Sequence, residues 1–415
     1  MIKLDHYKLR GFKNLMEADV SLTNVNVIIG PNNSGKSNFI QSISFLNYVI
    51  NGSTDDLEKS FSNGFSGTHY RGIIPFRNLY LASDTHKHED RVSFELRFSN
   101  TKSNNTFKYE LELAYISDLF DEDSFSIYSE SLEVKEIGKP GKATNVFSRK
   151  INMIKFGSEL TKVSGLNELP GYLSTVRILK IMSGGPQFTD AANSLNTIIK
   201  TPTFYFSNTE LLKAEALDRV NVFNGRTVSF DLEKEIIGLE QGTKWNIFCS
   251  AVKNILNISS VFIHTYTSNE RLKKEERKVQ KVLLFEHFGH MKRINQMSDG
   301  TILIIALVTK VLTSENDIFF IEEPENSIHP KALIDLFSFL QSFSESKQFV
   351  ISSHSIALLN KTRIEDILTS CATENGDSEI KNVLDRKELK QRLKSSYVNF
   401  SDELFFGVGD KDEFE

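Results

Sequence analysis

The feature that most constrains this chain is the segment GPNNSGKS at residues 30–37, between a short apolar run and an amphipathic one. Residues 25–29 (VNVII) predict a buried strand, and residues 38–49 predict a helix. Glycines let the backbone turn tightly, so that its N–H groups can point at phosphate oxygens, and the following helix N-terminus favours an anion. Lys36 can reach the β- and γ-phosphates, and the Ser37 hydroxyl can ligate Mg²⁺. The expected nucleotide-binding residues are Gly30, Asn32, Asn33, Ser34, Gly35, Lys36 and Ser37.

The run IFFIEEP at residues 318–324 predicts a second part of the same site. Its four apolar residues predict a buried strand, and ligands of open α/β sheets bind at the carboxyl edge where Glu322 and Glu323 follow. We expect Glu322 to hold the water shell of Mg²⁺ and Glu323 to polarise the attacking water as general base. An acidic turn after a strand is common, so this interpretation depends on the phosphate loop.

Two further motifs are ambiguous when taken alone. Ser298, Asp299 and Gly300 open a strongly apolar helix predicted over residues 301–312, where a hydroxyl and free N–H groups can bind an anion. The alternative is an ordinary N-cap. His354 follows a predicted strand and can contact a γ-phosphate or the attacking water, although a lone histidine there usually has no such role. The order of the four motifs along the chain favours the functional interpretation.

Composition narrows the class of protein. Of 415 residues, 40% are hydrophobic and 25% charged, which excludes a disordered or fibrous chain. The net charge of -5 gives no global basic field for nucleic acid, although a local basic surface remains open. Cys249 and Cys371 have no metal-ligand spacing, and the most apolar stretch, residues 302–312, is too short to cross a bilayer. We therefore expect a cytoplasmic protein without zinc and without a membrane partner.

The motif set resembles that of ATP-binding-cassette (ABC) ATPases of the RecF/SMC-like group, and most of all the ATPase modules of OLD-type and other abortive-infection systems. LRGFKNL (residues 9–15) is similar to the first strand of that group, GPNNSGKSN to its Walker A motif, and MSDGT to its signature. IEEPENSIHP is similar to Walker B with the D-loop, and SSHS to the switch-histidine segment. The resemblance implies ATP and Mg²⁺ as cofactors and a homodimer or higher oligomer, with each ATP between Lys36 of one chain and the signature of another.

Three departures from the family pattern stand out. The signature has Asp299 and Thr301 where transporters commonly have Gly and Gln. Glu322 occupies a position where Asp is commoner. No glutamine lies between Gln41 and Gln187, so the usual Q-loop residue has no candidate, although residues 69–72 (HYRG) stand near that place.

The patterns place the fold in the α/β class: an ABC-ATPase head with a mixed sheet, interrupted by a β-rich arm and a helical insertion. An opening strand is expected over residues 1–12, and alternating runs between about 92 and 135 predict two to three antiparallel strands. No heptads are sustained, so we expect no long coiled coil. The expected parts are the head (1–50 and 261–370), the arm (51–165), the helical insertion (166–260) and a C-terminal extension (371–415).

Two charged segments, residues 271–281 and 403–415, could bind a partner molecule. Residues 271–281 (RLKKEERKVQK) carry six basic and two acidic side chains; they predict either a phosphate-backbone contact or, more readily, a solvated hairpin. The acidic tail, residues 403–415, could dock a basic partner, but a frayed terminus is the simpler interpretation. Only 60 residues follow Ser355, fewer than the Toprim nuclease fold of some OLD-type proteins needs.

We therefore expect an ATPase that serves as a nucleotide-dependent sensor or assembly platform for a separate effector, a nuclease or toxin, in anti-phage defence. Two alternatives stay open: a RecF/SMC-like ATPase of DNA repair or chromosome maintenance, and a nucleotide-gated scaffold with negligible turnover.

Overall fold

The computed structural model describes residues 1–62, 91–117, 123–157, 168–179, 186–201, 203–205, 220–221, 227–228, 232–267, 279–372 and 376–383. The chain forms two compact units, which we describe separately. The first comprises Met1–Thr203, Asn316–Phe320 and Ser344–Glu415; the second comprises Phe204–Glu315 and Ile321–Phe343. Three segments singled out in the sequence lie outside the described residues, namely 69–72, 403–415 and most of 271–281.

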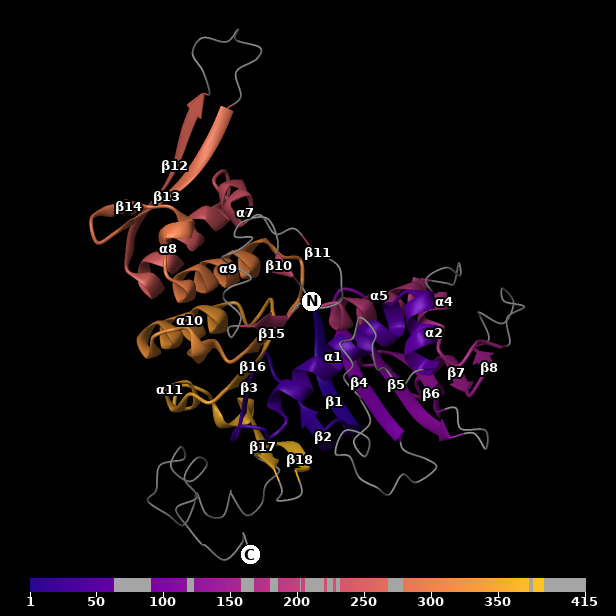
Figure 1. Cartoon of the computed structure of the whole chain (residues 1–415). Helices are drawn as coiled ribbons and strands as arrows, with labels where there is room; N and C mark the ends of the chain where they lie inside the picture. The colour runs from indigo at the N-terminus through magenta and orange to yellow at the C-terminus, as the bar shows by residue number, and fades with distance from the viewer. Residues whose placement is uncertain are drawn as a thin grey trace, which may run out of the picture. The chain divides into compact units, whose positions relative to one another are not determined.

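A large mixed sheet forms the first unit (Figure 1). Its strands follow the order β8-β7-β6-β5-β4-β1-β2-β18-β17-β3-β16-β15-β9, where the last two residues of β15 and of β9 (Thr203–Tyr205) are assigned to the second unit. Their bounds are β1 (Ile2–Phe12), β2 (Leu15–Ser21), β3 (Val25–Ile29), β4 (Arg91–Asn100), β5 (Asn105–Ser117), β6 (Asp123–Glu136), β7 (Thr144–Lys150), β8 (Met153–Phe156), β15 (Ile318–Glu322), β16 (Gln348–Ser353), β17 (Ile367–Ala372) and β18 (Ser378–Asn382).

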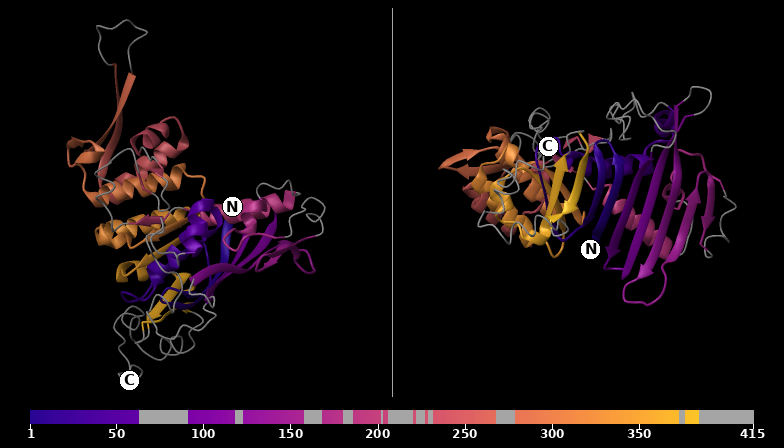
Figure 2. Two further views of the ribbon diagram at one scale, coloured as in Figure 1. Left: turned by 45° about the vertical axis from the view of Figure 1, so that its right-hand side comes forward. Right: turned by 90° about the horizontal axis from the view of Figure 1, so that it is seen from below.

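The two halves of this sheet differ in strand direction. From β2 through β1 and on to β8 every neighbouring pair is antiparallel, and these strands lie side by side in the right-hand view of Figure 2. In the other half, β3 pairs in parallel with both β16 and β17, and β18 pairs in parallel with β2. Parallel strands need crossover connections, and sequence far from β3 therefore supplies both of its neighbours.

Helices cover one face of the antiparallel half. α1 (Lys36–Asn51), α2 (Thr54–Ser62), α4 (Thr175–Leu179) and α5 (Pro186–Ile199) contact each other or this sheet, and the short α11 (Ile356–Leu359) and η3 (Ile364–Asp366) follow β16. Aromatic side chains fill the layer between helices and strands: the ring centroids of Phe12 and Phe45 lie 5.5 Å apart and those of Tyr7 and Phe39 lie 5.2 Å apart. Period-two alternation places Tyr7 on the covered face, and Phe12 is buried there too because the left-handed Gly11 (φ 71°) interrupts the alternation of β1.

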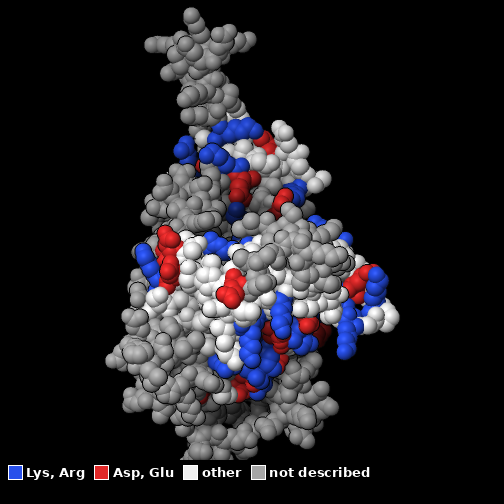
Figure 3. Space-filling model, turned by 90° about the vertical axis from the view of Figure 1, so that its right-hand side faces the viewer, with Lys and Arg blue, Asp and Glu red and all other residues white. Residues whose placement is uncertain are grey.

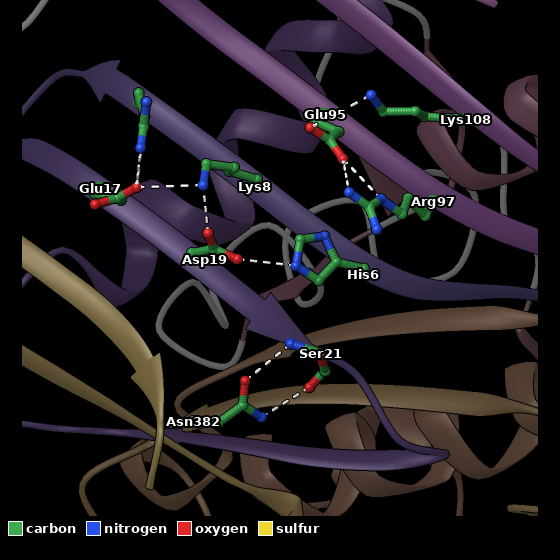
Figure 4. A network of polar contacts seen from close by, with 10 residues as sticks. His6, Lys8, Glu17, Asp19, Ser21, Glu95, Arg97, Lys108 and Asn382 are labelled. Carbon is green, nitrogen blue, oxygen red and sulfur yellow. Dashed lines mark hydrogen bonds and ion pairs between the residues drawn. The ribbon is translucent and has the colours of Figure 1, made fainter. Parts of the chain in front are cut away.

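The opposite face of the antiparallel half is polar. Lys8 contacts Asp19 and lies 3.5 Å from Glu17, and Asp19 also accepts a 2.8 Å hydrogen bond from His6 (Figure 4). Burial raises the pKa of Asp19, but the hydrogen bond and the charge of Lys8 outweigh burial and hold it below its ordinary value. Figure 3, seen from the side of β8, shows basic side chains with acidic ones among them. The described residues of this sheet face therefore present paired charges.

A buried polar cluster pins residues 169–175 to the sheet. Glu130 on β6, 1% exposed, accepts hydrogen bonds from the Tyr109 hydroxyl (2.9 Å) and from the backbone N–H of Thr175 (2.7 Å). Its cross-strand neighbour Arg149, 3% exposed, donates to the carbonyl of Pro170 at 2.8 Å and to that of Leu173. Burial lowers the pKa of Arg149, and the charge of Glu130 opposes that shift.

The second unit is mainly helical. It contains α7 (Leu232–Gly238), α8 (Thr243–Leu256), η1 (Ile294–Gln296), α9 (Asp299–Thr313), η2 (Pro324–Asn326) and α10 (Pro330–Ser342), with a small sheet of β12 (Ile258–Thr267), β13 (Val279–His287) and β14 (His290–Lys292), and the pair β10 (Val220–Asn221) and β11 (Thr227–Val228). β9 (Thr203–Tyr205) leads into it. α8 packs on α9 and α10. Lys310, inside the apolar α9, forms a 2.8 Å ion pair with Glu235 of α7, which explains a charge in so apolar a helix.

The structure confirms the predicted α/β class with a mixed sheet. Within the described ranges the longest helix, α1, has 16 residues, so no long coiled coil is found there, and no helix is long and apolar enough to span a membrane. β2 and the hairpin β17–β18 were not predicted. The expected division into head, arm, insertion and extension stays a prediction. The strands β4–β8, which fall within the expected arm, directly continue the sheet of β1 and β2.

Replacing Arg149 by Met should lower the free energy of unfolding by about 3–5 kcal/mol, because it leaves Glu130 buried without an opposite charge. Urea denaturation of the full chain measures the change. The matched control is Lys139→Met: Lys139 forms a 2.5 Å ion pair with Glu136, also on β6, but both side chains are largely exposed, so the loss should be under about 1 kcal/mol. Equal losses in the two variants would contradict a stabilising role of the buried cluster.

Candidate functional site

The phosphate loop lies where the sequence predicts it, between the carboxyl end of β3 and the start of α1. Gly35, the N-cap of α1, has a φ of 92°, and Asn33 has a φ of 62°; this left-handed region is open to glycine and tolerated by asparagine. At Gly30 a Cβ atom would lie 2.2 Å from the carbonyl oxygen of Ser370, so a side chain has no room there. The first turn of α1 contains no acidic residue to oppose the helix dipole.

Lys36 is folded back into this loop. Its side chain is 4% exposed, and Nζ donates to the carbonyl oxygens of Gly30 at 2.9 Å and Pro31 at 2.7 Å. The Ser34 hydroxyl also donates to the Pro31 carbonyl, at 2.8 Å. The ammonium group is therefore held at the loop, and phosphate oxygens, which are stronger acceptors, can take over its hydrogen bonds. Ser37, half-buried, occupies the first turn of α1.

The first unit also brings His354 to this edge of the sheet. β16 pairs in parallel with β3, with Ser353 opposite Ile29, so His354 and Gly30 each follow at the same register. Carboxyl ends of parallel strands form the ligand-binding edge of an open α/β sheet. The phosphate loop and His354, separated by more than 300 positions in sequence, thus belong to one edge.

The paired carboxylates end β15. Glu322 is its last residue and is 8% exposed, while Glu323 has a φ of 47°, a left-handed conformation that costs about 1–3 kcal/mol for a residue other than glycine. A 2.7 Å hydrogen bond from the Asn326 side chain to Glu323 Oε2 holds the carboxylate in this turn. Strained residues of this kind cluster at functional sites. The role of Glu323 as general base stays a prediction.

The signature motif forms the start of α9 in the second unit. Ser298 is the N-cap: its Oγ lies 2.8 Å from the Thr301 hydroxyl and 3.4 Å from the Thr301 N–H. Asp299 and Gly300 form the first turn. At Gly300 a Cβ atom would lie 2.0 Å from the carbonyl oxygen of Ser327, so this turn packs directly against the segment that follows Glu323. The N-cap interpretation of the motif is confirmed. Ser298 also lines a cavity of about 250 Å³, and its predicted anion binding stays a prediction.

The predicted residues thus fall into two sets. The phosphate loop, Ser37 and His354 belong to the first unit, and Ser298, Asp299, Gly300, Glu322 and Glu323 belong to the second. Among the described residues no three His, Cys, Asp or Glu side chains gather as a metal site. The predicted Mg²⁺ ligands Ser37 and Glu322 belong to different units, and their role stays a prediction. The glycine-lined loop with its lysine fits a phosphate chain.

Sequence reasoning missed the residues that support the loop from outside. Asn14, in the turn between β1 and β2, donates to the carbonyl of Asn33 at 3.0 Å, and Ser370 on β17 donates to the carbonyl of Ser34. Neither Asn14 nor Ser370 belongs to a motif whose spacing would point to this role. Only the adjacent KN pair within residues 9–15 marks a polar turn between two apolar strands.

Residues 25–360 match a protein family described as "AAA domain, putative AbiEii toxin, Type IV TA system". The match spans most of the chain and takes in every residue predicted above for the site. The chain belongs to this family. Membership confirms the resemblance to ATPase modules of the abortive-infection type that the motif order predicted, and it makes the chain a P-loop ATPase domain by family.

Solved structures of SMC head domains are similar to this AAA-family chain. The head domain from Thermotoga maritima has a TM-score of 0.42 and 13% identity, with 91% of this chain and 98% of that chain covered. A head with an extended coiled coil, derived from Pyrococcus furiosus and bound to the C-terminal domain of ScpA, has a TM-score of 0.45 and 10% identity, with 95% and 100% covered. At such scores these likenesses do not bear on what this chain binds. No curated protein matches it.

Proposed function

We propose that this AAA-family chain binds ATP with Mg²⁺, hydrolyses it slowly as a head-to-head dimer, and thereby controls a separate effector in anti-phage defence. The observation that carries nucleotide binding is the loop between β3 and α1, with a buried Lys36 whose hydrogen bonds go to loop carbonyls. That lysine, the loop N–H groups and the α1 N-terminus together suit the negative charge of a triphosphate.

For hydrolysis we assign the roles by position and chemistry. Ser37 and Glu322 would hold Mg²⁺, which when bound neutralises charge on the β- and γ-phosphates. Glu323 would accept a proton from the attacking water while the bond between the γ-phosphorus and the bridging oxygen breaks and ADP leaves with the electron pair. The left-handed backbone of Glu323 and its hydrogen bond from Asn326 support this role, since they fix a carboxylate at a strand end. His354 would contact the γ-phosphate or the same water.

Two substitutions separate binding from turnover. Lys36→Ala should weaken ATP binding at least about tenfold, because it removes a charge-assisted donor, whereas Glu323→Gln should retain binding and lose hydrolysis by about 10²–10⁴-fold. A fluorescent-nucleotide titration and a phosphate-release assay give the two quantities. Glu325→Gln, two residues further along the same turn, is the control and should hydrolyse ATP normally. Normal turnover in Glu323→Gln would remove Glu323 as general base, and no turnover in the unmodified chain would favour the nucleotide-gated scaffold.

Dimerisation through the signature follows from the same proposal. Ser298 is exposed at the N-terminus of the long helix α9, where a hydroxyl and the helix dipole suit the γ-phosphate of an ATP held by another copy. ATP would then join two copies, and its hydrolysis would release them.

A mixing experiment tests the shared site. Ser298→Arg should leave ATP binding to the monomer intact and abolish ATP-driven association and turnover. Mixing Ser298→Arg with Lys36→Ala chains should restore part of the turnover, because each mixed dimer has one intact site. Glu315→Arg, just beyond the other end of α9 and exposed, should associate normally when ATP is added. Absence of recovery in the mixture, with both variants folded and the control active, would contradict a composite site.

A separate effector completes the proposed function. We assign the damage to a second protein that this ATPase restrains or assembles according to the bound nucleotide. In support, no three His, Cys, Asp or Glu side chains gather as a metal site within the described ranges. The family is described as a "putative AbiEii toxin", so the experiment below also tests whether this chain itself cleaves nucleic acid. The cytoplasmic setting stays a prediction that rests on composition.

Incubation of the purified chain with plasmid, linear DNA or RNA, in the presence of Mg²⁺ or Mn²⁺ and ATP, should give no cleavage. Phage restriction in cells should require both Glu323 and the catalytic residues of the product of the neighbouring gene. Cleavage that co-elutes with this chain and is lost when its own carboxylates are replaced would contradict a separate effector. Strong, salt-dependent DNA binding by the isolated chain would instead favour the RecF/SMC-like alternative.

A further inference from the structure

Two consecutive carbonyl groups of the phosphate loop are tied to side chains outside it. The carbonyl of Asn33 accepts a 3.0 Å hydrogen bond from Asn14 Nδ2, and the carbonyl of Ser34 accepts one from the Ser370 hydroxyl. Asn14 is 8% exposed and Ser370 is 2% exposed, so neither bond competes freely with water. These two bonds, which we name the carbonyl tethers, lie on adjacent peptide units.

A tether on a carbonyl also fixes the opposite end of its peptide unit. In a planar trans peptide the C=O and the following N–H point in opposite directions. Holding the Asn33 carbonyl towards Asn14 therefore turns the N–H of Ser34 away from Asn14. Holding the Ser34 carbonyl towards Ser370 does the same for the N–H of Gly35. Each tether thus selects the direction in which one donor of the phosphate loop is aimed.

The tethers are themselves anchored. Asn14 Oδ1 accepts a 2.6 Å hydrogen bond from the Asn38 side chain in the first turn of α1, and its carbonyl accepts from the N–H of Ser378 at 2.8 Å. Ser370 sits on β17, which pairs in parallel with β3 directly beside the loop. A phosphate loop without such supports would have to order its donors when the ligand binds, and that ordering costs free energy.

We propose that Asn14 and Ser370 are positioning residues that pre-organise the N–H groups of Ser34 and Gly35 for the phosphates of the nucleotide. The inference rests on the proposed function, since it concerns the same loop. Asn14, Ser370 and Ser378 all lie outside residues 25–360, the part that matches the family. The two ends of the chain therefore set the affinity of a loop that the family segment supplies.

The test measures ATP affinity and stability side by side in the full chain. Asn14→Ala and Ser370→Ala should each weaken ATP binding about two- to tenfold, the effect of one lost hydrogen bond, and the double variant should weaken it further. Ser370→Thr retains the hydroxyl and should restore the affinity. Because the tethers act on binding, KM for ATP should rise more than kcat falls.

Two controls remove side chains that make equivalent bonds elsewhere in the same unit. Thr369→Val, the neighbour of Ser370 on β17, loses a 3.3 Å hydrogen bond to the Lys381 carbonyl. Asn382→Ala loses the pair of 2.8 Å hydrogen bonds that this amide makes with the backbone of Ser21 (Figure 4). Both should retain the ATP affinity of the unmodified chain, even where they lower the urea midpoint. A fall in affinity that merely parallels the midpoint across tethers and controls would overturn the inference.

Hydrogen–deuterium exchange supplies a readout that does not depend on ATP. In the tether variants, amides of residues 33–36 should exchange faster than in the two controls, and unchanged exchange there would also overturn the inference. If Ser370→Ala does not fold, Asn14→Ala, which removes one tether, is compared with Ser370→Thr, which retains the other. Only Asn14→Ala should then bind ATP more weakly. Should the unmodified chain bind no ATP, the proposed function fails. If Lys36→Ala loses ATP binding while both tether variants retain it, the role of the tethers is contradicted and the proposed function still holds.

Discussion

The parallel pairing of β3 with a strand on each side is the constraint on which the candidate site depends. β16 and β17 both align with β3, with Ser353 and Thr369 opposite Ile29, so His354 and Ser370 come at the same register as Gly30 on one edge. All five residues of β3 are buried, which makes the strand a rigid base for the loop that follows it. Only glycine fits at position 30 on that edge, because the Ser370 carbonyl leaves no space for a Cβ atom.

The same sheet separates apolar packing from charge. On the covered face of the antiparallel half, aromatic side chains of β1 and β4 pack against α1, so the helix that begins at the phosphate loop is fixed by its buried side. On the other face, side chains of opposite charge form ion pairs, such as that of Lys8 with Asp19. In the second unit, by contrast, the signature turn and the turn after Glu323 are joined through the close packing of Gly300 and Ser327.

Much of the fold and of the candidate site could be predicted because its signals are local. The spacing from Gly30 to Ser37 specifies a turn and a helix start, and the apolar run before Glu322 specifies a buried strand; the structure has both. Lys310 is a case where local pattern was insufficient. Its charge within an apolar helix is explained only by Glu235, which lies 75 positions away.

The sequence by itself determined which residues have the chemistry to bind phosphate, polarise water and cap a helix, because residue type and short spacing decide those properties. It also determined the family, through the order of the motifs. Only the tertiary structure decided which groups support the loop. Ser370 reaches the carbonyl of Ser34 across 336 positions. Asn14 reaches the carbonyl of Asn33 from a turn between strands that no periodicity marks. Contacts of this kind arise from strand pairing between distant segments, and a pattern read along the chain contains no measure of that pairing.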